Sequence, residues 1–330
     1  MLGRRPEHPS GWTLGSEPEG DRKNNPDRGG FTRMTPVPTA AAPQRVLLGI
    51  LFMMLATSLF PVMNGLVKIL SADYPTEQII WARTASHLVF VLLLFGPGIG
   101  WRIFRSVRLK AQIGRSLVLL CSTTCFFSGV KFMPLAEASS ISFASPFIVA
   151  LMAVPLLGEK LSLVRLAAVA VGFLGVLVVV RPGSEVFNWA SLLIFGSAFF
   201  YASYQILTRF VAGHDRPETS VVYSALVGTV VMTAVVPFFW TTPHDLADIA
   251  LLASLGVLGG LGHYCVARSL TYAAASVVTP FHYWQIVGAV TTGYLLFGDL
   301  PDVYTWTGAA LIVGSGLFIG WRETRERAQP

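Results

Sequence analysis

The chain has 330 residues, of which 53% are hydrophobic and only 13% charged, and its mean hydropathy is +0.60. Soluble domains carry roughly 25% charged residues, so this composition argues against a soluble globular protein, a disordered chain and a disulfide-rich secreted module. The net charge of +6 raises the question of nucleic-acid binding. We expect no nucleic-acid partner, because the basic residues gather between apolar runs, as in cytoplasmic membrane loops.

The first 44 residues differ from the rest of the chain. They hold seven prolines and many charges but no apolar run, and we expect residues 1–44 to be a disordered cytoplasmic tail. A signal peptide needs an apolar core of roughly 7–15 residues, which this segment lacks. Whether translation begins at Met1 or Met34 is left open, and neither alternative changes the fold prediction.

From Arg45 onward, long apolar runs alternate with short connections rich in Pro, Gly and charge. A bilayer core of ~30 Å needs about 20 helical residues at 1.5 Å each. The expected transmembrane helices are 46–70, 78–97, 114–132, 136–157, 162–180, 188–208, 219–240, 248–267, 275–297 and 304–321. The sequence therefore predicts an all-α integral membrane protein of ten transmembrane helices.

The positions of Lys and Arg predict the orientation. With the N-terminus inside, fourteen basic residues fall on the cytoplasmic side, five of them in the segment 102–115. Only Lys68, Lys131 and Arg181 fall outside, and Arg83 lies within the second span. We therefore expect both termini to be cytoplasmic.

The chain matches itself at a shift of about 140 residues. Asn64 aligns with Gln205 and Glu77 with Glu218 at a shift of 141, and the Gly-Glu pair at 158–159 aligns with Gly-Asp at 298–299. Each half then holds five spans, and an odd number makes the second half enter the membrane from the opposite side. We expect an inverted-topology repeat, 45–182 (spans 1–5) and 183–322 (spans 6–10), followed by a cytoplasmic tail, 323–330. Secondary transporters commonly use this design, in which two half-bundles rock around a central site.

Two segments carry a family resemblance. The sequence from Leu135 to Phe147, followed by 156–161, and its echo at 274–281, followed by 295–301, resemble the EamA repeat of the drug/metabolite transporter superfamily. The resemblance covers roughly residues 46–322. It implies ten transmembrane helices, two EamA domains and solute transport by alternating access. Members carry amino acids, nucleotide-like metabolites, vitamins such as riboflavin, S-adenosylmethionine and metallophores, and the resemblance does not choose among them.

Polar and aromatic side chains within the spans are the candidate substrate-binding residues, because exposing their polar groups to lipid is unfavourable. They are Asn64, Arg83, Glu137, Tyr201, Gln205, His263, His282, Tyr283 and Trp284.

Each candidate has a structural alternative. Arg83 is either a ligand of a substrate carboxylate or an interfacial anchor. Glu137 is either part of the substrate site or a cap of its own helix. For the two histidines, and for the pair Asn64 and Gln205, the alternatives are substrate binding and hydrogen bonding between helices.

Other motifs point to architecture. Pro146 and Pro280 should kink or break their spans. The run from Gly256 to Gly260 is a small-residue packing face, and the serines and threonines of spans three and four should ease close helix packing. The two Gly-acid turns at 158–159 and 298–299 have two interpretations. They are either helix ends, in which Gly adopts a left-handed cap and the acid caps the next helix, or parts of a gate.

We therefore expect a secondary transporter of a small organic metabolite in the cell inner membrane. The alternatives are a membrane-embedded lipid-modifying enzyme and a non-transporting scaffold. No catalytic, phosphate-loop or paired-Cys motif is present, so we expect no enzyme activity, no cofactor and no metal. The expected partners are the small-molecule substrate and membrane lipid, and a homodimer is left open.

Overall fold

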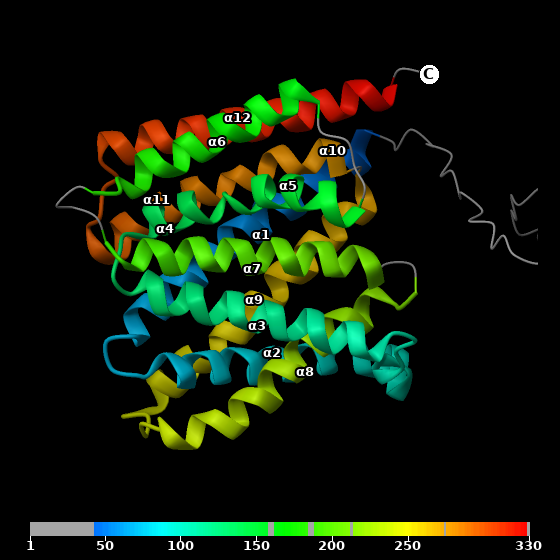
Figure 1. The fold of residues 1–330 in the computed structure, drawn as a ribbon. Helices are drawn as coiled ribbons and strands as arrows, with labels where there is room; N and C mark the ends of the chain where they lie inside the picture. Colours follow the sequence, from blue (N-terminus) through cyan, green and yellow to red (C-terminus); the bar gives the residue numbers. More distant parts are fainter. Residues whose placement is uncertain (1–42, 158–161, 184–187, 212–213, 274, 329–330) are drawn as a thin grey trace, which may run out of the picture. The chain divides into compact units, whose positions relative to one another are not determined.

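The computed structural model describes residues 43–157, 162–183, 188–211, 214–273 and 275–328. The regular secondary structure of these residues is entirely helical (Figure 1). The first half comprises α1 (Pro43–Leu70), α2 (Thr76–Ile99), α3 (Leu109–Val130), α4 (Leu135–Ser142), α5 (Ser145–Leu157) and α6 (Leu163–Val180). The second half comprises α7 (Ala190–Val211), α8 (Pro217–Val235), α9 (Leu246–Tyr272), α10 (Ala275–Val278), α11 (Trp284–Phe297) and α12 (Val303–Ala328). Short 3-10 helices follow α2 (η1, Gly100–Phe104), α8 (η2, Val236–Phe238) and α10 (η3, Thr279–Tyr283).

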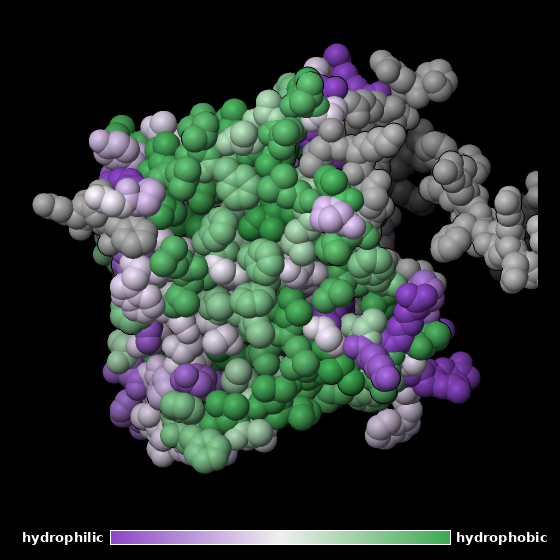
Figure 2. All heavy atoms as spheres, in the orientation of Figure 1, coloured by the Kyte–Doolittle hydropathy of each residue, from purple (hydrophilic) through white to green (hydrophobic). Residues whose placement is uncertain are grey.

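Nine helical segments within the described residues are long and apolar enough to cross a membrane. They match the expected spans except the ninth, 275–297, which is divided among α10, η3 and α11. Figure 2 shows a broad hydrophobic band across the visible face, with hydrophilic residues gathered toward its two ends. This distribution is what a lipid bilayer requires of a multi-pass membrane protein. Most of the expected N-terminal tail lies outside the described residues, and α12 continues to Ala328, into the expected C-terminal tail.

The contacts between helices repeat when each helix is replaced by its counterpart in the other half of the chain. α1 packs on α9 and α11, while α7, its counterpart in the second half, packs on α3, α4 and α5. Likewise α2 packs on α9 and α8 packs on α3. Two pairs are their own counterparts, namely α2 with α8 and α6 with α12, and α4 of the fourth span packs on α11 of the ninth. Exchanging the halves therefore reproduces the packing, as expected for a repeated unit.

Two spans are broken in the middle, as the prolines predict. The fourth span ends its first helix at Ser142 and restarts at Ser145, directly before Pro146. The ninth passes through the 3-10 helix η3, which contains Pro280. Proline lacks a backbone donor and is tolerated in the first turn of a helix, and both prolines lie in the first turn of the segment that restarts after the interruption. α4 and α11 lie against each other, which brings the two interruptions into the same region.

The turn after α11 is only partly as predicted. Gly298 takes the left-handed conformation (φ +70°) that ends the helix, as expected. Asp299, expected to cap the next helix, instead forms an ion pair with Lys68 at 3.0 Å. The cap is Asp302, whose carboxylate accepts a hydrogen bond of 2.8 Å from the backbone N–H of Thr305. The matching turn at 158–159 lies outside the described residues.

A glycine stripe brings α9 against α2. A Cβ on Gly256 would lie 2.1 Å from Ser86 Oγ and 2.2 Å from the backbone nitrogen of His87. Real Cβ atoms essentially never approach below 3.0 Å, so only glycine permits this contact. One turn further, a Cβ on Gly259 would lie 3.6 Å from the guanidinium nitrogens of Arg83. The predicted small-residue packing face is confirmed, and it sets the position of Arg83.

Ion pairs join the two halves at one end of the bundle, which we call the Lys68 end. Lys68 Nζ contacts both the Asp299 carboxylate and the carbonyl oxygen of Met133, the latter at 3.2 Å. Arg181, at the end of α6, pairs with Asp302 before α12. Desolvation alone would raise the pKa of Asp302, but hydrogen bonds from the start of α12 and the pairing with Arg181 outweigh it and lower the pKa.

The opposite end, which we call the Asp215 end, is joined by hydrogen bonds. Asp215, between α7 and α8, accepts from Ser106 Oγ and the backbone N–H of Val107, both at 2.6 Å, and from Gln112 Nε2 at 3.0 Å. Desolvation alone would raise the pKa of Asp215, but these donors outweigh it and lower the pKa. Connections from the two halves therefore meet at both ends of the bundle.

Arg115, counted above among the basic residues of the cytoplasmic segment 102–115, is a buried structural residue. It lies in α3 and is 1% exposed. Its guanidinium donates to Tyr204 Oη at 3.1 Å and Thr208 Oγ1 at 3.2 Å on α7, and to the Ser220 carbonyl at 2.5 Å and Ser224 Oγ at 3.0 Å on α8. Four oxygen acceptors allow this charge to be buried, and they fasten α3 to the second half.

Candidate functional site

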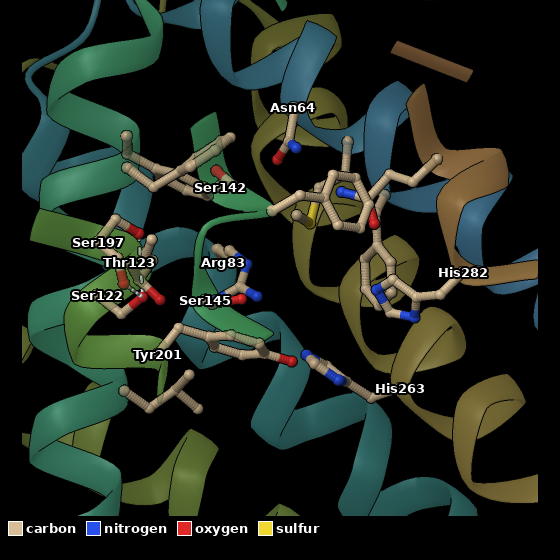
Figure 3. Close-up of a pocket in the computed structure, with 18 residues that line it drawn as sticks. Asn64, Arg83, Ser122, Thr123, Ser142, Ser145, Ser197, Tyr201, His263 and His282 are labelled. Carbon is tan, nitrogen blue, oxygen red and sulfur yellow. Dashed lines mark hydrogen bonds between the residues drawn. The ribbon is translucent and has the colours of Figure 1, made fainter. Parts of the chain in front are cut away.

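A cavity of about 190 Å³ lies between helices of both halves (Figure 3). Its wall comes from α1, α2, α3, α7 and α9 and from the interruptions of the fourth and ninth spans. The lining residues are Phe60, Met63, Asn64, Arg83, Leu119, Ser122, Thr123, Phe126, Phe127, Ser142, Phe143, Ser145, Ser197, Ala198, Tyr201, His263, His282 and Gln285.

The repeat and the two interruptions explain where the cavity lies. Phe60 and Tyr201 are 141 positions apart, so they occupy equivalent places in the two halves, and both line it. Ser142 and Ser145 flank the break in the fourth span, and His282 comes from η3 in the ninth. Broken spans near the midplane are where transporters of inverted-repeat design bind their solutes.

Five of the nine sequence candidates line this cavity, namely Asn64, Arg83, Tyr201, His263 and His282. In Figure 3, Arg83 lies at the centre of the group, and the hydroxyl of Tyr201 points toward the ring of His263. His282 packs edge-on against Phe143, with ring centroids 5.9 Å apart. These side chains come from five different spans, so the tertiary fold brings them together.

The other four candidates lie elsewhere. Gln205 is half-buried on α7, one turn beyond Tyr201, and is not among the lining residues. Tyr283 packs against Phe143 at 4.9 Å between ring centroids.

The remaining two candidates sit at the edge of the bundle. Trp284 is 41% exposed and donates from Nε1 to Ser58 Oγ at 3.2 Å. Glu137 lies in the first turn of α4, where its electrostatic neighbours are the charged residues of the Lys68 end.

Several lining residues were expected to serve packing alone, and one histidine beside the cavity was not foreseen. Ser122, Thr123, Ser142 and Ser145 were expected to ease helix packing, yet they form a hydroxyl-rich wall of the cavity. His87 was missed, although it lies four residues after Arg83 and so shares its helix face. Its ring stacks on His263, with centroids 5.9 Å apart and an angle of 11° between planes.

The fold and the cavity define a class of protein. A helical membrane bundle made of two equivalent halves, with a polar cavity between them, has the architecture of a secondary transporter. The sequence comparisons give the family. The model of the EamA-like transporter family matches residues 47–181 and 188–321, and the chain belongs to this family. That assignment favours a small-molecule transporter over the enzyme and scaffold alternatives.

Individual relatives match most of the chain. A riboflavin transporter from Vibrio cholerae is 29% identical over 284 residues, covering 85% of this chain and 95% of the relative. A pseudopaline exporter from Pseudomonas aeruginosa is 29% identical, over 80% of this chain and 93% of the relative. An S-adenosylmethionine uptake transporter from Rickettsia conorii is 29% identical, over 71% and 80%.

A solved crystal structure shares the fold. It superposes with a TM-score of 0.59 at 18% sequence identity, covering 87% of this chain and 99% of the other. At this identity the likeness concerns the arrangement of helices alone.

Proposed function

We propose that the cavity binds a small organic metabolite and that the chain carries this metabolite across the cell inner membrane by alternating access. The observation that carries the proposal is the composition of the cavity wall. Both halves contribute to it, and so do both interrupted spans. A solute held there contacts both halves, so relative movement of the halves would change its exposure from one side to the other.

The proposed substrates are those of the relatives, namely riboflavin, pseudopaline and S-adenosylmethionine. The cavity volume of about 190 Å³ is below the roughly 300–1,000 Å³ of typical ligand pockets. In this conformation the cavity admits a compact solute or one portion of a larger one. We therefore extend the candidates to amino-acid-sized metabolites.

The proposed topology follows the basic residues. The Asp215 end adjoins segment 102–115 with its five basic residues, and we assign this end and both termini to the cytoplasm. The Lys68 end is then external. The proposed domains are 45–182 and 183–322, one for each half, with tails at 1–44 and 323–330. A homodimer remains open.

A steric block tests the assignment of the cavity. Thr123 lines the cavity and its hydroxyl forms no recorded hydrogen bond within the described residues, so Thr123→Trp fills the space without removing a structural bond. Leu93→Trp, at a residue that is 73% exposed on α2, adds the same bulk to the bundle surface. Proteoliposomes are assayed for uptake of the three substrates and of a mixed metabolite extract.

We expect the wild type and Leu93→Trp to move at least one solute, and Thr123→Trp to lose that transport at equal protein content. Unchanged transport by Thr123→Trp would show that the solute passes elsewhere. Absence of any transported solute in the wild type would overturn the proposed function.

A further inference from the structure

Arg83 is a half-buried charge on the cavity wall, and the described residues supply no partner for it. Its guanidinium forms no recorded hydrogen bond or ion pair with them, and its Nε is enclosed without an acceptor. Its nearest described aromatic contact is the ring of Phe127, with 5.6 Å between Cζ and the ring centroid. A charge within a membrane span is unfavourable unless it is compensated, and such a residue usually serves a function.

The surrounding groups do not offer a negative charge. The titratable side chains near Arg83 are His87 on its own helix and His263, His282 and Tyr201 on the packed helices, and no Asp or Glu is among the described residues that line the cavity. A histidine near neutral pH is either neutral or cationic, and tyrosine is neutral. The cavity therefore carries net positive charge in the absence of solute.

Arg115 gives an internal comparison. It is 1% exposed and its Nε likewise lacks an acceptor, but four oxygen atoms accept hydrogen bonds from its other two guanidinium nitrogens. This chain therefore surrounds a structural arginine with acceptors. Arg83 is instead held against the bare backbone of α9 at Gly259, with its charge in the cavity (Figure 3).

We propose that Arg83 binds the carboxylate of the transported metabolite, so that the substrate class is a compact organic acid. The inference rests on the proposed function and names the substrate class of the same site. A single guanidinium balances one negative charge, which favours a carboxylate over a doubly charged phosphate, and its paired N–H groups match the two carboxylate oxygens. The serine and threonine hydroxyls and the aromatic rings of the wall then contact the rest of the molecule.

A binding experiment isolates the charge of the ligand. Purified protein in detergent is heated with phenylacetate or isovalerate, and with phenylacetamide or isovaleramide, which have nearly the same shape but no charge. We expect the carboxylates to raise the melting temperature of the wild type above that with the amides. We expect this difference to vanish in Arg83→Gln and to survive in part in Arg83→Lys. The apparent affinity of Arg83→Gln for carboxylates should be weaker by about tenfold or more. Equal effects of acids and amides, or an unchanged response in Arg83→Gln, would overturn the proposal.

The stability of the empty protein is a second readout. Because Arg83 has no described partner, Arg83→Met leaves no acceptor unpaired, and we expect it to melt at or above the wild-type temperature. Arg115→Met should melt well below it, because four acceptors lose their donor. A collapse of Arg83→Met comparable to that of Arg115→Met would assign Arg83 to the structure and overturn the proposal.

Transport separates this inference from the proposed function. Metabolites are profiled in cells that express the wild type, Arg83→Gln or Arg83→Lys at equal abundance. We expect the metabolites moved by the wild type to be organic acids and to be lost in Arg83→Gln. If the wild type moves uncharged metabolites and Arg83→Gln moves them equally well, the substrate class is wrong and the transporter function stands. If the wild type moves none, the proposed function fails, and the binding experiment still decides the role of Arg83.

Discussion

The contact between α2 and α9 should be intolerant of a single methyl group at Gly256. The Cβ of Gly256→Ala would lie 2.2 Å from the backbone nitrogen of His87 and 2.6 Å from the carbonyl oxygen of Arg83. Backbone atoms within a helix cannot rotate away, so α2 and α9 must separate by about 1 Å. Overpacking of this kind costs about 1–3 kcal/mol, against which alanine regains roughly 0.5–1 kcal/mol of helix propensity. With the clash on backbone atoms, we expect a net loss of about 2 kcal/mol.

The assay is the melting temperature of purified protein in detergent, where about 2 kcal/mol corresponds to a decrease of roughly 3 °C for a chain of this size. Transport should fall as well, because the separation displaces Arg83 from the cavity. Gly259→Ala is the control on the same helix, since its nearest neighbour is the flexible Met63 Sδ at 3.3 Å. Gly314→Ala on α12, with nothing within 4 Å of its Cβ, is the control on another helix. A melting temperature of Gly256→Ala equal to those of both controls would refute the close approach of α2 and α9.

Asp215→Asn should lower the melting temperature at neutral pH, because the amide accepts more weakly from Ser106 and Gln112 than the carboxylate does. The pKa of Asp215 is lowered in the folded protein, so its stabilisation is present above the usual aspartate pKa of about 3.9 and disappears as the pH falls through the lowered value. Melting temperatures of the two proteins should therefore converge in acid, and a constant difference down to low pH would contradict this account. A reporter enzyme fused near Leu109 should register as cytoplasmic, and an external signal would contradict the proposed orientation.

Some features of this protein follow from local sequence. Apolar runs of about 20 residues separated by Pro, Gly and charge suffice to place the spans, because the bilayer imposes both length and polarity. Pro146 and Pro280 mark where the fourth and ninth spans are interrupted, although proline alone does not decide this, because Pro61 lies within the continuous helix α1. The shift of about 141 residues likewise relates Phe60 to Tyr201 without any knowledge of the fold.

The choice among polar side chains was decided by tertiary structure. Arg83 and His263 face the cavity, whereas Gln205 and Trp284 do not line it, although all four lie in predicted spans. Arg115 was counted among the cytoplasmic basic residues, and the sequence did not show that it is buried, because its acceptors come from α7 and α8, about 90–110 positions away. In a soluble helix the polar face marks the side turned to water, but in lipid the exposed face is as apolar as the buried one. Periodicity therefore locates membrane helices without showing which side faces a partner, and only their packing brings Arg83 to a cavity that no described Asp or Glu lines.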